Sequence, residues 1–209
     1  IGLDRPLMLR QQIRALLDNH GVQERIFVLL VATTGLRTNE GLALRWMDFN
    51  EADRTITVAH TLYRQQLKVP KTPSSRRMIR LHFSISQILT AHRQQSAFQT
   101  ETDFIFCREN GEPQYDTTMR SRLYRAMDAA EIKRVKGKHG YHVFRHTAAS
   151  LLYAKSRDLK LVQGLLGHSN ISTTSDIYVH LDGATVAEGT DMLTEVILGE
   201  MLADCSPTV

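Results

Sequence analysis

The residues best suited to chemistry lie in one stretch, 139–180, which reads HGYHVFRHTAASLLYAKSRDLKLVQGLLGHSNISTTSDIYVH. His142 and Arg145 are three residues apart, so they share one face if this segment is helical. His168 follows an apolar run, and Tyr178 comes after it. A phenol can act as a nucleophile, an arginine matches phosphate oxygens, and histidines donate or carry protons, so together they could attack a phosphodiester. The alternative is that the cations are ordinary surface residues and the tyrosine is a core aromatic.

Two further blocks lie upstream, ATTGLRTNEGLALRWMDF at 32–49 and KTPSSRRMIRL at 71–81. They precede HVFRHT, LLGHSNISTT and IYVH in the C-terminal half. The five blocks in this order, spread over residues 7–180, resemble the catalytic domain of a tyrosine recombinase of the phage integrase family. The resemblance implies site-specific DNA recombination, with integration or excision of a mobile element, through a 3′-phosphotyrosyl intermediate.

The resemblance also implies a set of six catalytic residues, which are Arg37, Lys71, His142, Arg145, His168 and Tyr178. It makes Lys71 the acid that protonates the leaving 5′-oxygen, with Lys68 as the competing candidate, and gives Glu40 a supporting place. Independently of the family, two arginines and a histidine can stabilise the negative charge that builds on phosphate oxygens. His142 can help the phenol of Tyr178, with an ordinary pKa of about 10, to lose its proton. No metal or other cofactor is implied.

Positive and negative charges are separated along the chain, whose net charge is +4. Residues 54–100 contain no Asp or Glu, and no Lys or Arg follows Lys160. A uniformly solvated surface would mix the two signs, so the pattern favours a basic face for a polyanion over a basic surface without a partner. The candidate DNA contacts are Lys68, Arg76, Arg77, Arg120, Arg122 and Arg125.

With 209 residues, 42% of them hydrophobic, the chain can form one domain with a sizeable core. No apolar run approaches the roughly 20 residues that span a bilayer, and no signal segment is recognisable. Cys107 and Cys205 match neither a disulfide framework nor a metal site. We therefore expect unpaired thiols, a cytoplasmic, nucleoid-associated prokaryotic protein, and no membrane partner or small-molecule cofactor.

The expected fold class is α+β, mainly α-helical with a small antiparallel three-stranded sheet, and the resemblance implies the tyrosine recombinase catalytic-domain fold. Thr38 is expected to cap the third helix. Lys71 is expected in the turn between the last two strands of the sheet. Hydrophobic spacing predicts helices over 6–19, 23–33, 39–46, 84–97, 116–130, 142–155, 158–166 and 184–199. Residue preferences predict sheet strands over 55–58, 65–69 and 77–81, and a short buried strand over 104–106.

We expect a catalytic domain over residues 1–183. Residues 184–209 are expected to form a C-terminal amphipathic helix and tail that could dock on a neighbouring subunit. The family's N-terminal core-binding and arm-binding domains are not present in this sequence, so we expect a fragment that is monomeric or weakly associated and binds DNA poorly. The resemblance further implies a homo-tetramer on double-stranded DNA at the recombination site.

Two other functions remain open from the sequence. A type IB topoisomerase or a telomere resolvase would use the same kinds of catalytic residue. A non-catalytic DNA-binding module would use segment 158–178 as a helix-turn-helix. The block LLGHSNISTT and its spacing to Tyr178 favour the recombinase over the first, and the complete set of six residues favours it over the second.

Overall fold

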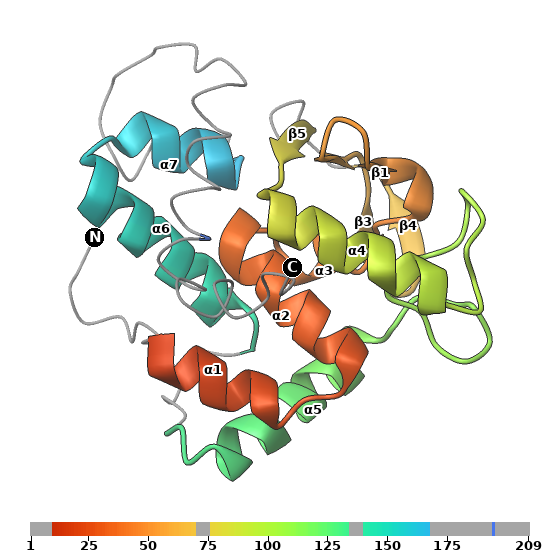
Figure 1. The fold of residues 1–209 in the computed structure, drawn as a ribbon, viewed down its shortest axis with the longest axis horizontal. Coiled ribbons are helices and arrows are strands. Elements are labelled where there is room, and N and C mark those ends of the chain that lie inside the picture. Colours follow the sequence, from red (N-terminus) through yellow and green to blue (C-terminus); the bar gives the residue numbers. More distant parts are fainter. Residues whose placement is uncertain (1–9, 70–75, 134–139, 168–193, 195–209) are drawn as a thin grey trace, which may run out of the picture.

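The structure is a computed structural model that describes residues 10–69, 76–133, 140–167 and 194. Within these ranges the chain is mainly helical, with short antiparallel strands gathered on one side (Figure 1). None of the helices described there has the length and apolar character needed to cross a membrane. The expected α+β class is therefore confirmed.

The fold is built around α2 (Val22–Thr34), which is buried along most of its length. It packs against α6 and also contacts α3, α4 and α5. A helix with neighbours on nearly all sides must be apolar all round, and the run from Ile26 to Ala32 meets this need. Phe27 lies at the centre, with its ring edge-on to Phe106 and Tyr141 at centroid distances of 4.8 Å each.

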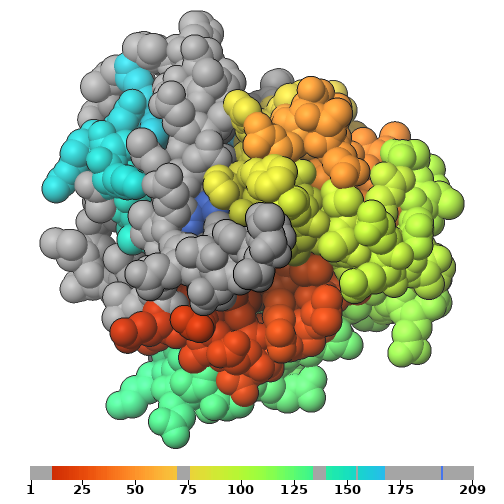
Figure 2. All heavy atoms as spheres, in the orientation of Figure 1, coloured from red at the N-terminus to blue at the C-terminus, as the bar shows by residue number. Residues whose placement is uncertain are grey.

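The other helices surround this centre and bury one face each. Helix α1 packs on α5, and α6 packs on α7. Figure 2 shows α1 and α5 together at the lower edge of the molecule, with the sheet region at the opposite upper side. The helices have the following bounds: α1 (Arg10–Asp18), α3 (Thr38–Gly41), α4 (Phe83–Gln95), α5 (Asp116–Ala129), α6 (His142–Ser156) and α7 (Leu159–Leu166).

The three-stranded sheet has the strand order β1-β2-β5, and both pairs are antiparallel. A separate hairpin pairs β3 with β4. The prediction that residues 65–69 form part of the main sheet is therefore wrong, because this segment pairs with β3. The third strand of the sheet is β1, which follows the 3₁₀ turn. The strands are β1 (Phe49–Asn50), β2 (Thr55–Val58), β3 (Thr61–Tyr63), β4 (Gln66–Lys68) and β5 (Arg77–Arg80).

Three local expectations also differ from the structure. The N-cap of α3 is Arg37, and Thr38 is already the first helical residue. The helix predicted over 39–46 ends at Gly41 and is followed by a 3₁₀ turn at Trp46–Asp48. Residues 105 and 106 are buried and Phe104 is partly buried, but the segment forms only an isolated bridge, between Arg45 and Phe104, and no strand. The predicted helix 184–199 falls almost entirely outside the described residues.

Candidate active site

The turn between α2 and α3 places Arg37. Gly35 caps the C-terminus of α2 with a φ of 65°, a left-handed conformation that glycine adopts without the penalty of a Cβ atom. Arg37 follows as the N-cap of α3, and 37% of its side chain is exposed. The guanidinium therefore stands at the surface on a short, rigid turn between two packed helices.

Glu40 lies in the first turn of α3 and joins two arginines. Its Oε1 accepts a hydrogen bond from Arg37 Nη1 at 2.7 Å, and its Oε2 accepts from the Arg37 backbone N–H at 3.0 Å. Arg77, at the start of β5, donates from Nη2 to Oε2 at 2.9 Å. Only 4% of the Glu40 side chain is exposed. This buried carboxylate thus fixes the Arg37 turn against the sheet.

The ionised form of Glu40 is favoured despite its burial. Desolvation opposes the charge, but the hydrogen bond and the charge of Arg77, followed by the hydrogen bonds from Arg37, outweigh it and hold the pKa of Glu40 below its ordinary value. The carboxylate is therefore negative at neutral pH.

Arg145 lies on α6, one turn after His142, and is buried, with 5% of the residue exposed. Its Nη1 donates to the carbonyl oxygen of Gly35, and its Nη2 donates to the carbonyl oxygen of Leu166 at 2.7 Å. Burial first, and then the positive charge of Arg37, lower the pKa of Arg145 to about 9. It remains protonated at neutral pH, as a charge fixed between the Arg37 turn and the end of α7.

The C-terminal end of α7 is contacted by both Arg77 and Arg145. Arg77 Nε donates to the carbonyl oxygen of Leu165 at 3.2 Å, one residue before the carbonyl that Arg145 contacts. Cations suit this end of a helix because its last carbonyls have no partners within the helix. Gly167 then ends α7 with a φ of 63°, and His168 is the next residue in the chain.

His142 is the first residue of α6 and is exposed. The protein packed around the ring, followed by the positive charges of Arg145 and Arg37, lowers the pKa of His142 below its ordinary value. The ring is therefore neutral near pH 7 and can accept a proton. The preceding Tyr141 is a core residue, 2% exposed, and its hydroxyl donates to the Met119 carbonyl at 3.4 Å.

The structure thus brings together the predicted Arg37, Glu40, His142 and Arg145. The charge of Arg37 influences the titration of both His142 and Arg145, which shows that the three side chains share one electrostatic environment. The other three predicted catalytic residues lie outside the described residues, and these are Lys71, His168 and Tyr178.

The six expected DNA contacts differ in their exposure and in their partners within the fold. Arg77 has 9% of its side chain exposed and pairs with Glu40, so the expectation that it contacts DNA is revised to an internal role. Arg122 forms an ion pair with Glu24 of α2, but 38% of its side chain is exposed, so it stays a candidate. The other four also stay candidates: three are exposed and one lies beside Gly140, and they are Lys68, Arg76, Arg125 and Arg120.

Sequence reasoning placed Gly35 at a turn and Gly167 at a helix end, but it missed their close packing and the internal role of Arg77. A Cβ atom on Gly35 would lie 2.7 Å from Leu166 Cδ2, and one on Gly167 would lie 2.9 Å from Arg77 Nη1. Each glycine directly follows an apolar helical run, and this is the sequence signal of a left-handed helix end. No comparable signal marks Arg77, because its partner Glu40 is distant in sequence.

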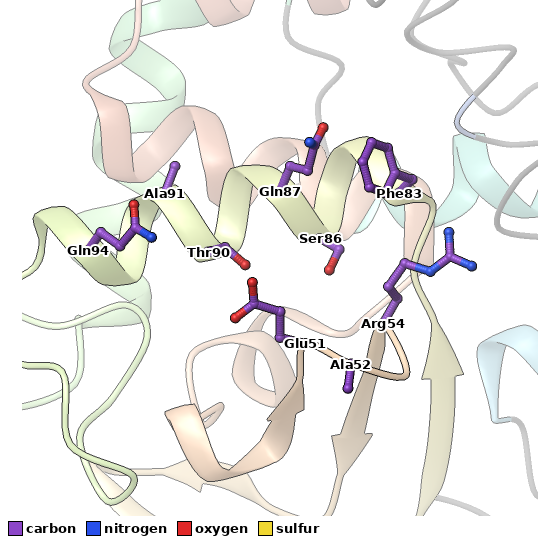
Figure 3. A pocket seen from close by; sticks show the side chains of 9 residues that line it. All are labelled: Glu51, Ala52, Arg54, Phe83, Ser86, Gln87, Thr90, Ala91 and Gln94. Carbon is purple, nitrogen blue, oxygen red and sulfur yellow. The ribbon is translucent and has the colours of Figure 1, made fainter.

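A pocket of about 690 Å³ lies away from these residues, between α4 and the turn that joins β1 to β2. Figure 3 shows Glu51 directed toward Thr90 across this pocket, with Arg54 and Phe83 near one end. None of the candidate catalytic residues lines it. Among the residues that the structure describes, no group of three or more His, Cys, Asp or Glu side chains could hold a metal ion.

Comparison with known proteins agrees with this geometry. The sequence profile described as the phage integrase family matches residues 7–184. Tyrosine recombinase XerH of Helicobacter pylori is 29% identical over 174 residues, which cover 83% of this chain and 45% of the relative. The integrase of Staphylococcus phage L54a is 27% identical over 186 residues, covering 79% of this chain and 52% of the relative. The chain therefore spans about half the length of these curated relatives.

Solved structures share the fold at low sequence identity. The Tn1549 transposon integrase in complex with a circular intermediate DNA has a TM-score of 0.70 at 22% identity, covering 88% of this chain and 65% of that one. XerH bound to a palindromic difH substrate has a TM-score of 0.61 at 22% identity, and the match covers 96% of this chain and 53% of the XerH chain. These similarities confirm the predicted catalytic-domain fold.

Proposed function

This chain belongs to the phage integrase family, and from that premise we propose that it is the catalytic domain of a tyrosine recombinase. It cuts DNA through a 3′-phosphotyrosyl intermediate and rejoins it to a new partner strand. Both the XerH and the Tn1549 integrase structures named above contain DNA, which supports double-stranded DNA as the partner. Relatives from a phage and a transposon support integration or excision of a mobile element as the process.

One observation carries the proposal, and it is the fixed position of Arg145. A buried guanidinium held by two backbone carbonyls from different parts of the fold cannot reorganise freely when a substrate arrives. Arg37 stands close enough to lower its pKa. Preorganised positive charge of this kind stabilises the negative charge that develops on the non-bridging oxygens of a phosphodiester under attack.

The reaction follows from the proposed roles of the side chains. The phenol oxygen of Tyr178 attacks phosphorus, and His142, neutral at pH 7, accepts the phenol proton. Arg37, Arg145 and His168 stabilise the charged phosphate. Lys71 gives a proton to the departing 5′-oxygen.

The ester between tyrosine and the 3′-phosphate keeps the energy of the broken bond. A 5′-hydroxyl from another strand can therefore attack this ester, release the phenol and rejoin the DNA without a nucleotide cofactor. Two duplexes require four such cuts, so we propose that the complete protein acts as a homo-tetramer on its recombination site.

The proposal is tested by covalent capture of DNA. The protein is incubated with a library of end-labelled nicked duplexes that contain a randomised segment, then denatured and separated on a gel. We expect a labelled band that resists the denaturant, that is lost in Tyr178→Phe and is strongly reduced in Arg145→Ala. Tyr115→Phe, a change of the same kind at an exposed tyrosine to which the proposal gives no role, should keep the band.

A band that persists in Tyr178→Phe would show that another residue is the nucleophile. A protein that binds the duplexes and never forms a covalent band would be a DNA-binding module, and the proposal would be wrong.

A further inference from the structure

Arg77 occupies an unusual place for an arginine next to a basic surface segment. It is the first residue of β5, six positions after Lys71, yet only 9% of its side chain is exposed. Its neighbours in the chain, Arg76 and Met78, are both exposed. Alternation along the strand therefore turns Arg77 inward, toward α3 and the end of α7.

The first inward contact of Arg77 is with Glu40. Nη2 lies 2.9 Å from Oε2 and Nη1 lies 3.4 Å from Oε1, so the planar guanidinium meets the carboxylate with both ends of its fork. The same carboxylate binds the side chain and the backbone N–H of Arg37. A displacement of Arg77 would thus be passed through Glu40 to the turn that carries Arg37.

The second inward contact is with the end of α7. Nε donates to the Leu165 carbonyl at 3.2 Å, and the side chain lies against Gly167, where an added Cβ would be 2.9 Å from Nη1 and 3.0 Å from Cδ. Gly167 directly precedes His168. The same guanidinium therefore fixes the C-terminal end of α7, directly before His168 in the sequence.

We propose that Arg77 is a positioning residue that sets Arg37 and the end of α7, which directly precedes His168, relative to each other. This inference rests on the proposed function, in which both residues act on one phosphate. Among the described residues Arg77 acts through Glu40, Leu165 and Gly167, and in this proposal it does not itself contact DNA. Lysine cannot replace it, because a single ammonium group lacks the fork that reaches a carboxylate and a carbonyl together.

The test compares Arg77→Lys with Arg80→Lys, the same change at an exposed position of the same strand. Two quantities are measured on the protein: the single-turnover rate of covalent capture at saturating DNA, and amide hydrogen exchange within 37–42 and 161–167. We expect Arg77→Lys to slow capture on the order of 100-fold, as small misplacements of catalytic groups do, with unchanged DNA affinity. Exchange should become faster in both segments, and Arg80→Lys should change neither quantity.

A second variant keeps the test decisive if Arg77→Lys does not fold. Glu40→Asp retains the negative charge but shortens the side chain that pairs with Arg77. It should likewise slow capture and speed amide exchange in both segments. The inference fails if the folded variant shows the same amide hydrogen exchange as the wild type in both segments. It also fails if DNA affinity falls while the capture rate at saturating DNA is unchanged, which is the result expected of a direct DNA contact. A wild-type protein without any covalent capture would refute the proposed function, whereas the exchange comparison would still decide the role of Arg77.

Discussion

Replacement of Gly35 by alanine should damage both stability and catalysis. The residue has a φ of 65°, and an alanine in the left-handed region costs about 1–2 kcal/mol. The new Cβ would also lie 2.7 Å from Leu166 Cδ2, and overpacking of this kind costs about 1–3 kcal/mol, nearer the lower figure here because the end of a leucine side chain can move. Together these effects predict a loss of roughly 2–4 kcal/mol.

Catalysis should fall because the carbonyl of Gly35 holds Arg145, and the Leu166 that must move is the other residue whose carbonyl holds it. Gly35→Ala therefore disturbs both anchors of the buried guanidinium. A misplacement on the ångström scale is expected to slow covalent capture on the order of 100-fold.

Gly111→Ala provides a matched control. Gly111 has a φ of 82°, and its Cβ would lie 2.8 Å from the Phe98 ring, so the change introduces the same two kinds of cost. The loop that carries it joins α4 to α5 at the side of the molecule remote from α6 and α7 (Figure 1). It should lose similar stability and keep its capture rate.

Urea unfolding measures the first effect, and capture at a temperature where all three proteins are folded measures the second. Equal losses of capture rate in the two variants would refute the role assigned to the Gly35 carbonyl. An undiminished stability of Gly35→Ala would refute the backbone conformation from which the cost was derived.

Three further outcomes follow from the site and its supports. The capture rate should fall as pH decreases through a pKa below 6.5, because His142 acts in its neutral form and its pKa is lowered; His142→Asn should remove this limb of the pH profile. Tyr141→Ala should cost about 3–5 kcal/mol in urea unfolding, as for other buried aromatic side chains, and Tyr141→Phe about 1 kcal/mol for its hydrogen bond. Glu40→Gln should cost about 3–5 kcal/mol at pH 7 because two arginines lose their buried charged partner. This difference should shrink as pH falls below 4.5, because the carboxylate of the unfolded wild type then takes up a proton, and it should be lost once pH has fallen through the lowered pKa of the folded carboxylate.

Each outcome has a clear opposite. A pH profile that is unaltered in His142→Asn would assign the acid limb to another group. A Tyr141→Ala protein of near-wild-type stability would contradict its place in the core. If the Glu40→Gln difference grew as pH fell, the sign of the pKa shift would be wrong.

The helices could be predicted because their apolar spacing and their ends are local properties. The predicted ranges 23–33 and 158–166 agree within a residue or two with α2 and α7, since an apolar run ended by glycine is written directly in the sequence. Of the candidate site, Arg37 and Arg145 could be proposed from their motifs, and the structure brings them into one environment.

The small antiparallel three-stranded sheet was predicted, but not which segments form it, because the turn between β3 and β4 uses residues that carry no turn signal. Arg64 and Gln65 both adopt positive φ, 50° and 62°, between β3 and β4, where glycine or asparagine would announce a tight hairpin. The role of Arg77 was equally hidden, since a buried ion pair depends on contacts between distant segments. Charge pattern alone suggests a surface arginine there.

The cluster around Glu40 has a consequence for the protein in the absence of DNA. Arg145 experiences repulsion from Arg37 and Arg77 and attraction from Glu40, so among the residues that the structure describes the positive charges there exceed the negative charge that balances them. Folding assembles this excess before any substrate is present, and a small multivalent anion such as sulfate would relieve it. A phosphodiester, the substrate in the proposed function, would balance this excess positive charge when it binds.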